Sequence, residues 1–487
     1  MKLILQKRNI IVVVLLLILL YFPIFLHLQK APIYIWDEAR LAWNAIEMSK
    51  NNNFIVTFFE GKPDEWNTKP PLMIILQSLS INILGINELS IRLPSAIAAL
   101  ITCLFLFFYL KRQTSQLVLG LFASLILVTA QGYINIHCSR TGDYDSLLIM
   151  FTTMFCFYFF DFITTRKLYS LKFFFLFLTL AVLTKGIQPL IFIPGLLILL
   201  FIINRDNHEK YQVKHIIFYG ALSAVTIAGY YLYRELLNPG FLKIVLKNEI
   251  GGRYLNTIEG HNHPIDYYFK LIREKQFGYW FFPMLLGIFI GIFNKNKKFK
   301  QLSVFCVILS VFYLLVISFS QTKLEWYDLP VFPFMAVLGA IAVHELFSLL
   351  KQIPQLKERL TVNVVPYLVV ILIFLFPYQA IIDKVYFPKS TDPLNESIPL
   401  MLKELPANKL TYVICWDNGY GPQINFYIEV LANKGITCYY KYYKDLEPGD
   451  IAIACQDFEK NYIETEYKNT ILLEKNAAKM YKIEARN

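Results

Sequence analysis

Charged residues are scarce in this 487-residue chain: Asp, Glu, Lys and Arg together make up 17% of it, whereas soluble domains carry about 25%. Cysteine is also sparse, with seven residues and no Cys-x-x-Cys pair. The first shortage excludes a soluble cytosolic enzyme and a disordered chain, and the second excludes a disulfide-rich secreted module. Hydrophobic residues dominate instead, at 56% of the chain with a mean hydropathy of +0.45.

The hydrophobic residues gather in long runs that are bounded by Lys and Arg. A run of about 18 or more apolar residues can cross the hydrocarbon core of a bilayer as a helix. Eleven runs qualify or come close, at about 10–28, 90–110, 116–134, 146–164, 170–184, 187–203, 215–233, 277–293, 302–319, 328–349 and 363–381. The sequence therefore predicts a mainly α, polytopic membrane bundle with about eleven crossings.

Basic residues decide whether the shorter run Pro71–Leu84 also crosses. If it does not, the basic loops around Lys111, Arg166 and Lys297 lie on the same side of the membrane as Lys2. If it does, all of these loops lie outside, against the positive-inside rule. We therefore expect a cytoplasmic N-terminus and an interfacial helix at Pro71–Leu84.

This topology places two long loops, 30–89 and 234–276, and the C-terminal region on the outer side. The composition changes at about residue 384, where charges become regularly spaced. Two strands and a helix are predicted beyond it: Leu410–Trp416, Asp450–Cys455 and Gln423–Asn433. We expect a transmembrane domain over 1–383, which carries the candidate site, and a small extracytoplasmic α/β domain over 384–487.

The chain is basic, with 47 Lys and Arg against 36 Asp and Glu and a net charge of +11. In a soluble protein this balance would indicate a nucleic-acid partner. In a membrane protein it follows from the positive-inside rule and from attraction to anionic lipids. We therefore expect the membrane, and no nucleic acid, as a partner.

Candidate acids cluster on the predicted outer side, where ionisable residues at helix ends are often functional. Asp37 and Glu38 lie close to Arg40, which suits a general base beside a bound anion. A solvated helix start is the alternative, because acids there suit the helix dipole. Asp145 ends a polar stretch that opens with Arg140. Helix capping explains this stretch as well as a shared pocket does.

Candidate cations lie on the same side. Lys69 precedes two prolines, which fix the backbone and hold its ammonium at the start of an interfacial helix. It can bind a lipid phosphate or serve as a snorkelling anchor. Lys323 and Tyr327 precede the tenth run, where they offer a second cation and a phenol donor or belong to an aromatic belt.

The loop at 234–276 contains Glu249, Arg253, His261 and His263. A His-x-His pair with a nearby Glu can ligate zinc, which makes His261 a candidate ligand. Two such histidines in a polar loop more often hold no metal. We therefore expect no metal site.

Several motifs follow one another in a set order. They are Asp37-Glu38-Ala39-Arg40, Lys69-Pro70-Pro71-Leu72, Glu88 to Pro94, Arg140 to Asp145, Leu183-Thr184-Lys185-Gly186, Glu249 to Tyr268, and Lys323 to Tyr327 with Pro330 and Pro333. Over roughly residues 30–335 this order resembles the GT-C membrane glycosyltransferases, in particular the bacterial aminoarabinose (lipid A) transferases and the protein O-mannosyltransferase-like enzymes.

The resemblance implies an enzyme that takes a sugar from a polyprenyl-phosphate carrier, with inversion, at the outer face of the bacterial cytoplasmic membrane. The acceptor is lipid A, a glycan or a protein, and no cofactor or metal is needed. By this resemblance Asp37, with Glu38 beside it, activates the acceptor, and Asp145 is the second acid. The candidate carrier-phosphate ligands are Arg40, Lys69, Arg140, Arg253, Lys323 and Tyr327.

The chain departs from the aminoarabinose transferases at Thr68, where they have an acid before the Lys-Pro motif. A metal site that uses that acid with His261 is therefore not expected here. A transporter or flippase of lipid-linked sugars is the alternative function. Such a protein carries broken helices and charges near the bilayer midplane, whereas the acids here lie at outer helix ends.

Overall fold

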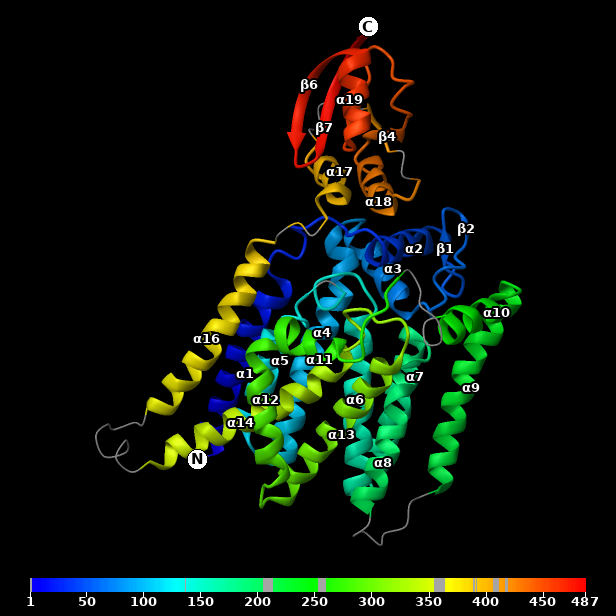
Figure 1. Cartoon of the computed structure of the whole chain (residues 1–487). Coiled ribbons are helices and arrows are strands. Elements are labelled where there is room, and N and C mark those ends of the chain that lie inside the picture. The colour runs from blue at the N-terminus through cyan, green and yellow to red at the C-terminus, as the bar shows by residue number, and fades with distance from the viewer. Residues whose placement is uncertain are drawn as a thin grey trace.

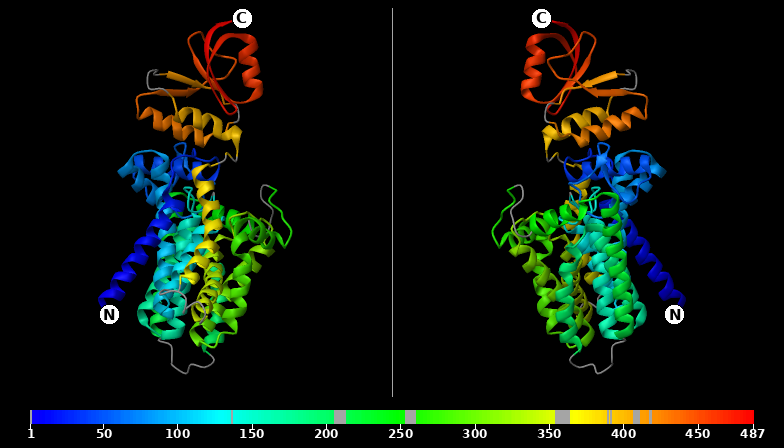
Figure 2. Two further views of the ribbon diagram at one scale, coloured as in Figure 1. Left: turned by 90° about the vertical axis from the view of Figure 1, so that its left-hand side faces the viewer. Right: turned by 90° about the vertical axis from the view of Figure 1, so that its right-hand side faces the viewer.

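The computed structural model describes residues 2–135, 137–204, 213–252, 260–353, 364–388, 390, 392–405, 411–416 and 419–487. These residues form a bundle of long helices with a small α/β unit at one end (Figure 1). The N-terminal end of the first helix lies at the opposite end of the bundle. Two further views show the α/β unit standing on the bundle as a separate layer (Figure 2). The predicted mainly α class with a small α/β unit is confirmed.

Each of the eleven predicted runs contains a helix. These helices are α1 (Lys2–Phe25), α4 (Glu88–Thr114), α5 (Leu117–Thr129), α6 (Asp145–Thr165), α7 (Leu168–Lys185), α8 (Phe192–Asn204), α9 (Val213–Leu237), α12 (Gly278–Ile292), α13 (Lys297–Phe319), α14 (Phe332–Gln352) and α16 (Val365–Tyr386). Short 3-10 turns, η1 (Gln188–Ile191) and η4 (Leu329–Val331), precede α8 and α14.

Fewer than eleven of these helices are long enough to span a membrane unaided. Over the described ranges, seven meet the length and hydropathy needed, or eight if Tyr267–Gln276 and Gly278–Ile292, bent by 115°, form one span. Helices α5 and α8 have 13 residues each. Helix α5 ends at Thr129 because the chain then leaves the helix for the irregular loop that carries the candidate acids.

Short elements gather at the end of the bundle beneath the α/β unit. Helices α2 (Asp37–Asn51) and α3 (Leu72–Leu84) pack against each other, and α3 also packs on α4 (Figure 1). The other short elements are β1 (Phe58–Phe59), β2 (Lys62–Pro63), α10 (Phe241–Val245), η2 (Leu246–Gly252), α11 (Tyr267–Leu271) and η3 (Ile272–Gln276). The first predicted outer loop is thus a folded layer.

Two glycines let neighbouring helices approach closely. A Cβ at Gly287 of α12 would lie 1.8 Å from the carbonyl oxygen of Leu338 in α14. A Cβ at Gly120 of α5 would lie 2.4 Å from the carbonyl oxygen of Phe107 in α4. The hydrophobic effect does not drive helices together in lipid, so membrane helices associate through van der Waals packing. Small residues at such crossings allow that close packing.

The α/β unit holds a mixed five-stranded sheet in the order β4-β3-β5-β7-β6. Its elements are α17 (Pro393–Lys403), β3 (Thr411–Ile414), α18 (Pro422–Ala432), β4 (Thr437–Tyr440), β5 (Ile451–Ala454), α19 (Asp457–Glu466), β6 (Tyr467–Lys475) and β7 (Ala478–Arg486). Strands β4, β3 and β5 are parallel, whereas β7 is antiparallel to both of its neighbours. The strands and the helix predicted here correspond to β3, β5 and α18.

Specific polar contacts fix the α/β unit to the bundle. The hydroxyl of Tyr427 in α18 donates to Glu88 Oε1 at 2.8 Å and accepts from the backbone N–H of Ile33 at 3.1 Å. Lys50 of α2 forms an ion pair with Glu429 of α18 at 2.7 Å. Helix α18 is therefore held directly over α2.

Candidate functional site

A pocket beneath the α/β unit collects several of the predicted acids and cations. It is lined by Asp37, Arg40, Leu41, Trp66, Asn67, Lys69, Asp143, Tyr144, Asp145, Lys185 and Trp326. These residues come from α2, from the segment before α3, from the loop before α6, from the end of α7 and from the turn before α14. Four of the predicted site residues, Asp37, Arg40, Lys69 and Asp145, therefore meet in one place.

Asp145 opens α6 and is neutralised by Lys185, the last residue of α7. The Lys185 Nζ atom lies 2.6 and 2.8 Å from the two carboxylate oxygens. The side chains are only 3% and 6% exposed. The same ammonium lies 5.9 Å from the centroid of the Tyr327 ring, so this predicted phosphate ligand is close to the pair.

Asp37 is the most open acid of the pocket, with 52% of its side chain exposed. Its carboxylate lies 3.9 Å from His137 Nδ1, which also lies 3.5 Å from Asp143 Oδ1. The His137 ring stacks on Trp326 with the centroids 3.6 Å apart. The pocket therefore has a row of acid, imidazole and acid beside the Asp145–Lys185 pair.

This row has the spacing of a cation site. The ligand atoms of Asp37, His137 and Asp143 all lie within 4.8 Å of one another. Burial disfavours charge on His137, but Asp143 and then Asp37 outweigh it and raise the histidine's pKa to about 9. Burial likewise opposes ionisation of Asp143, yet His137 keeps the pKa of Asp143 below its ordinary value. At neutral pH the imidazolium itself supplies the positive charge between the acids.

The predicted metal candidate His261 is not part of this row. Its backbone carbonyl accepts a hydrogen bond from the Lys323 N–H at 3.0 Å. The expectation that no metal is needed stays a prediction, and Asp37, His137 and Asp143 are the residues that could hold one.

Arg40 lines the pocket and forms an ion pair with the buried Asp64. Its guanidinium donates two hydrogen bonds to Asp64, at 2.9 and 2.6 Å, and the Asp64 side chain is fully buried. It also lies 4.2 Å from the centroid of the Phe59 ring. Asp64 accepts from Asn44 as well, at 3.0 Å. Most of the charge on Arg40 is therefore already balanced by Asp64.

Lys69 lies between the pocket and Glu249 in η2. Its Nζ atom is 3.9 Å from Glu249 Oε1 and 5.8 Å from the centroid of the Tyr144 ring. The hydroxyl of Thr68, which replaces the acid of the resembling enzymes, donates to the same Glu249 oxygen at 2.7 Å. Glu249 thus supplies a carboxylate to this region from another part of the chain.

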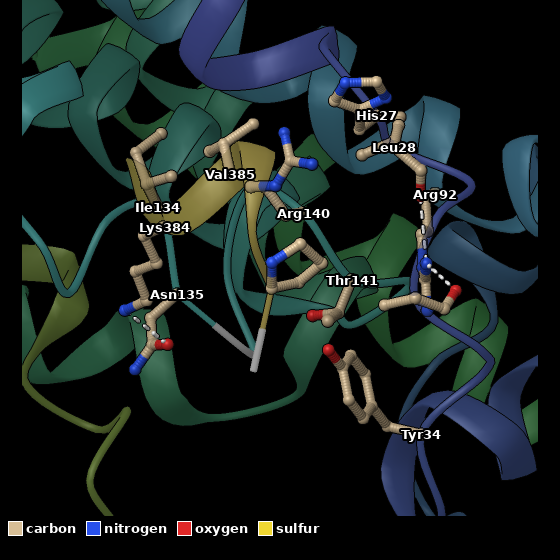
Figure 3. Close-up of a pocket in the computed structure, with 12 residues that line it drawn as sticks. His27, Leu28, Tyr34, Arg92, Ile134, Asn135, Arg140, Thr141, Lys384 and Val385 are labelled. Carbon is tan, nitrogen blue, oxygen red and sulfur yellow. Dashed lines mark hydrogen bonds between the residues drawn. The ribbon is translucent and has the colours of Figure 1, made fainter. Parts of the chain in front are cut away.

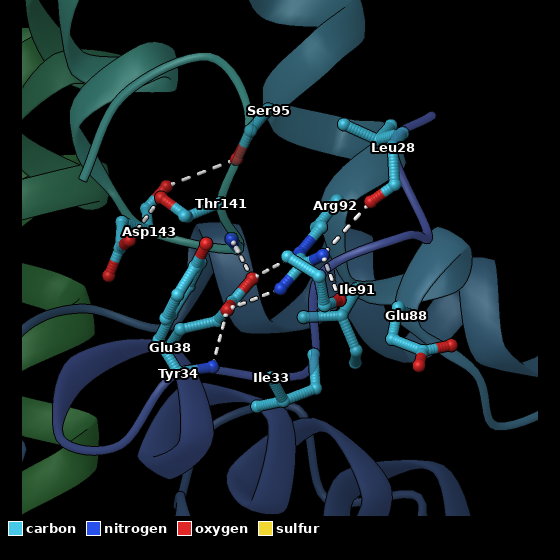
Figure 4. A network of polar contacts seen from close by, with 12 residues as sticks. Leu28, Ile33, Tyr34, Glu38, Glu88, Ile91, Arg92, Ser95, Thr141 and Asp143 are labelled. Carbon is cyan, nitrogen blue, oxygen red and sulfur yellow. Dashed lines mark hydrogen bonds and ion pairs between the residues drawn. The ribbon is translucent and has the colours of Figure 1, made fainter. Parts of the chain in front are cut away.

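Glu38, predicted to act beside Asp37, does not line the pocket. Its carboxylate is 2% exposed and pairs with Arg92 of α4 at 2.7 and 2.9 Å (Figure 4). It also accepts from the backbone N–H groups of Tyr34 and Gly142, both at 2.9 Å. Glu38 therefore ties the start of α2 to α4 and to the loop before α6, which positions the two acidic segments beside each other.

Two further predicted phosphate ligands, Arg140 and Lys323, do not line this pocket. Arg140 lines a second pocket with Lys384 (Figure 3), and its guanidinium donates to the backbone carbonyls of Pro23, Ile24 and Leu26. Lys323 is buried and donates to the carbonyl of Ser320 at 2.6 Å. Arg253 lies outside the described residues. Of the six predicted cations and donors, Arg40 and Lys69 line the pocket and Tyr327 borders it.

Sequence reasoning missed Lys185 and His137 as site residues. Lys185 had a signal, because it is a cation in an outer turn within a motif of the resembling enzymes. His137 had none, since it lies in an irregular loop with a left-handed backbone, φ 66°. Its acidic partners on two segments become apparent only in the fold.

Known proteins are similar to this chain in sequence and in fold. Residues 68–232 match the family model described as dolichyl-phosphate-mannose-protein mannosyltransferase. Two crystal structures of ArnT from Cupriavidus metallidurans, one bound to undecaprenyl phosphate and one in the apo state, are similar with TM-scores of 0.68 and 0.66. Both are 13% identical in sequence, and each match covers 98% of both chains. This chain shares the fold of ArnT.

Further proteins are also similar to this chain. The archaeal oligosaccharyltransferase AglB from Archaeoglobus fulgidus, in complex with an inhibitory peptide and a dolichol-phosphate, has a TM-score of 0.51 at 12% identity, over 87% of this chain and 64% of AglB. Two uncharacterized proteins of Aquifex aeolicus (strain VF5) are 23% and 26% identical. The first match covers 65% of this chain and 60% of the relative, and the second covers 75% and 78%. The resemblance predicted from the motifs is confirmed at the level of the fold.

Proposed function

We propose that this protein is a glycosyltransferase that moves a pentosyl or hexosyl group from a polyprenyl-phosphate carrier to an acceptor at the outer face of the bacterial cytoplasmic membrane. One observation carries the proposal. An open carboxylate, Asp37, shares a pocket with the buried Asp145–Lys185 pair and with Lys69. A base for the acceptor and cations for a phosphate thus stand together at one end of the helix bundle.

The chemistry follows from these charges. The acceptor hydroxyl gives its proton to Asp37, and its oxygen attacks the anomeric carbon of the donor. The bond between that carbon and the phosphate oxygen breaks, and its electron pair leaves with the carrier phosphate. Lys69 and Lys185 stabilise the charge that develops there, because fixed cations in a water-poor pocket act more strongly than in bulk water. A single displacement of this kind inverts the anomeric configuration.

An apolar groove supports a lipid carrier. Side chains of α3, α4 and α6 line it, among them Leu79, Ile83, Ile97, Leu147 and Met150. Helix α6 leads from this groove to Asp145. A prenyl chain in the groove can therefore place its phosphate near the acid, which agrees with the undecaprenyl phosphate bound by the similar ArnT structure.

The proposed orientation rests on the charge pattern and on the direction of α4. This helix of 27 residues begins beside α18, where Glu88 accepts from Tyr427, and has Lys111 and Arg112 in its last turn. Its length of about 40 Å matches a bilayer crossing. A cytoplasmic N-terminus and an outer α/β unit then put the basic turns inside.

The test is complementation of a deletion strain. Mass spectrometry of lipid and glycan fractions identifies the species that lacks its sugar in the strain, and the intact chain restores it. Asp37→Asn should leave the product below a hundredth of the wild-type amount while the protein remains in the membrane. Asp383→Asn is the matched control, because this exposed acid accepts from Gln379 in its own helix and does not line the pocket. Wild-type product with Asp37→Asn would end the assignment.

A further inference from the structure

Exposed aromatic rings stand at the mouth of the pocket. Trp36 is 62% exposed and Trp66 is 53% exposed, although tryptophan is normally among the more buried residues. Trp36 directly precedes Asp37, and Trp66 lines the pocket itself. Large apolar surface is thus presented beside the proposed base, and none of the steps above uses it.

The Trp36 backbone is held in an unfavourable conformation. Its φ of 74° and ψ of −117° lie in a region that favours glycine. Such strain persists where surrounding contacts impose it, and it concentrates at functional sites. Here the Trp36 carbonyl accepts from the Arg40 N–H at 2.9 Å, so the Trp36 backbone is tied to the start of α2.

The α/β unit contributes a ring to the same place. Tyr420, between β3 and α18, stacks on Trp36 with centroids 5.3 Å apart and planes at 20°. It is also nearly parallel to Phe59, at 6.2 Å and 22°. Phe59 in turn lies 4.2 Å from the Arg40 guanidinium. Two separate parts of the chain therefore build one aromatic array next to Asp37.

We propose that Trp36 and Tyr420 form an acceptor subsite that binds a saccharide ring. The faces of a sugar ring carry C–H groups that pack on aromatic faces, and its rim carries hydroxyls that Asp37 and Arg40 can bind. This inference rests on the proposed function, since it assigns the acceptor side of that site. The acceptor is then a glycan or the sugar headgroup of a glycolipid, and the α/β unit takes part in choosing it.

A membrane anchor is the competing explanation for an exposed tryptophan. Interfacial anchors place single amphipathic rings at the headgroup level. Trp36 is instead stacked on a ring of the α/β unit, on a strained backbone, beside a carboxylate. These features fit a binding surface for a defined ligand. An interfacial lipid anchor needs none of them.

The experiment uses the full chain in nanodiscs. Saturation-transfer NMR measures binding of two probes, β-1,6-linked glucosamine disaccharide and N-acetylglucosamine tetrasaccharide. A parallel arm measures binding of undecaprenyl phosphate. The variants are Trp36→Ala, Trp36→Phe and Tyr420→Ala. The matched control is Phe458→Ala, because Phe458 is 46% exposed and contacts Tyr443 edge-to-face in the same unit.

We expect at least one saccharide to bind, and Trp36→Ala and Tyr420→Ala to weaken it at least tenfold. Trp36→Phe should keep most of the binding, and Phe458→Ala all of it, while undecaprenyl phosphate binds equally to every variant. Equal saccharide binding by Trp36→Ala, or no saccharide binding by the wild type, would overturn the subsite. The fluorescence of Trp36 is obtained as the difference between the wild type and Trp36→Phe. Quenching of this fluorescence by brominated lipids would establish Trp36 as a membrane anchor instead. If the wild type does not bind undecaprenyl phosphate, the proposed function is overturned.

Discussion

Removing the Lys185 ammonium leaves the Asp145 carboxylate buried without its partner. The pair is 6% and 3% exposed, and both carboxylate oxygens lie within 2.8 Å of Nζ. Breaking a buried ion pair by removing one partner costs about 3–5 kcal/mol, because the remaining charge keeps its desolvation penalty. Lys185→Met should therefore lower the Tm clearly, since that is a large part of a typical free energy of unfolding.

The double variant Asp145→Asn/Lys185→Met separates stability from chemistry. Both charges are absent, so no uncompensated charge stays buried and most of the lost stability should return. The amount of glycosylated product should nevertheless stay near zero, because the proposed site has lost an acid and a cation. The assay is a thermal scan of the purified protein together with mass spectrometry of the product in the deletion strain.

Three outcomes would refute this reasoning. A Tm of Lys185→Met equal to that of the wild type would mean that the ammonium and the carboxylate are not paired in a water-poor pocket. Full product from the double variant would mean that Asp145 and Lys185 have no part in transfer. A double variant as unstable as Lys185→Met would show that packing, and not charge, determines the loss.

The remaining predictions concern the cations and the topology. Lys69→Ala should reduce co-purified undecaprenyl phosphate at least fivefold with little change in Tm, whereas Lys62→Ala, an exposed lysine of β2, should not; equal lipid in both would contradict the role of Lys69. Because the folded pKa of His137 is raised to about 9, its stabilising contribution is complete below about pH 6.5 and is lost as the pH rises through 9. The Tm should therefore fall between pH 7 and 10 in the wild type and less in His137→Gln, and parallel pH curves would refute the ion pairs. EDTA should leave transfer unchanged, because the imidazolium already balances Asp37 and Asp143, and restoration of EDTA-inactivated enzyme by a divalent metal would show otherwise. A reporter fused after Lys111 should indicate the cytoplasm and one after residue 390 the outer compartment, and the reverse pattern would invert the proposed topology.

The sequence by itself determined the helices of the bundle and much of the α/β unit. The length of an apolar run predicts a bilayer-spanning helix almost without reference to the rest of the chain. In lipid, each helical span must form its backbone hydrogen bonds within itself. Strands β3 and β5 and helix α18 were recognisable from their local apolar patterns. The end of α5 was not, since residues 130–135 and 137–144 lie outside helices and build the site.

Only the tertiary structure decided which partner each charge receives. Asp37 and Glu38 are neighbours in the sequence, yet successive side chains point about 100° apart around a helix. Asp37 consequently opens into the pocket, whereas Glu38 turns inward to Arg92. The ion pair of Asp145 with Lys185 likewise joins the start of one helix to the end of the next. Such pairings depend on how helices pack, and they could not be read from the order of residues along the chain.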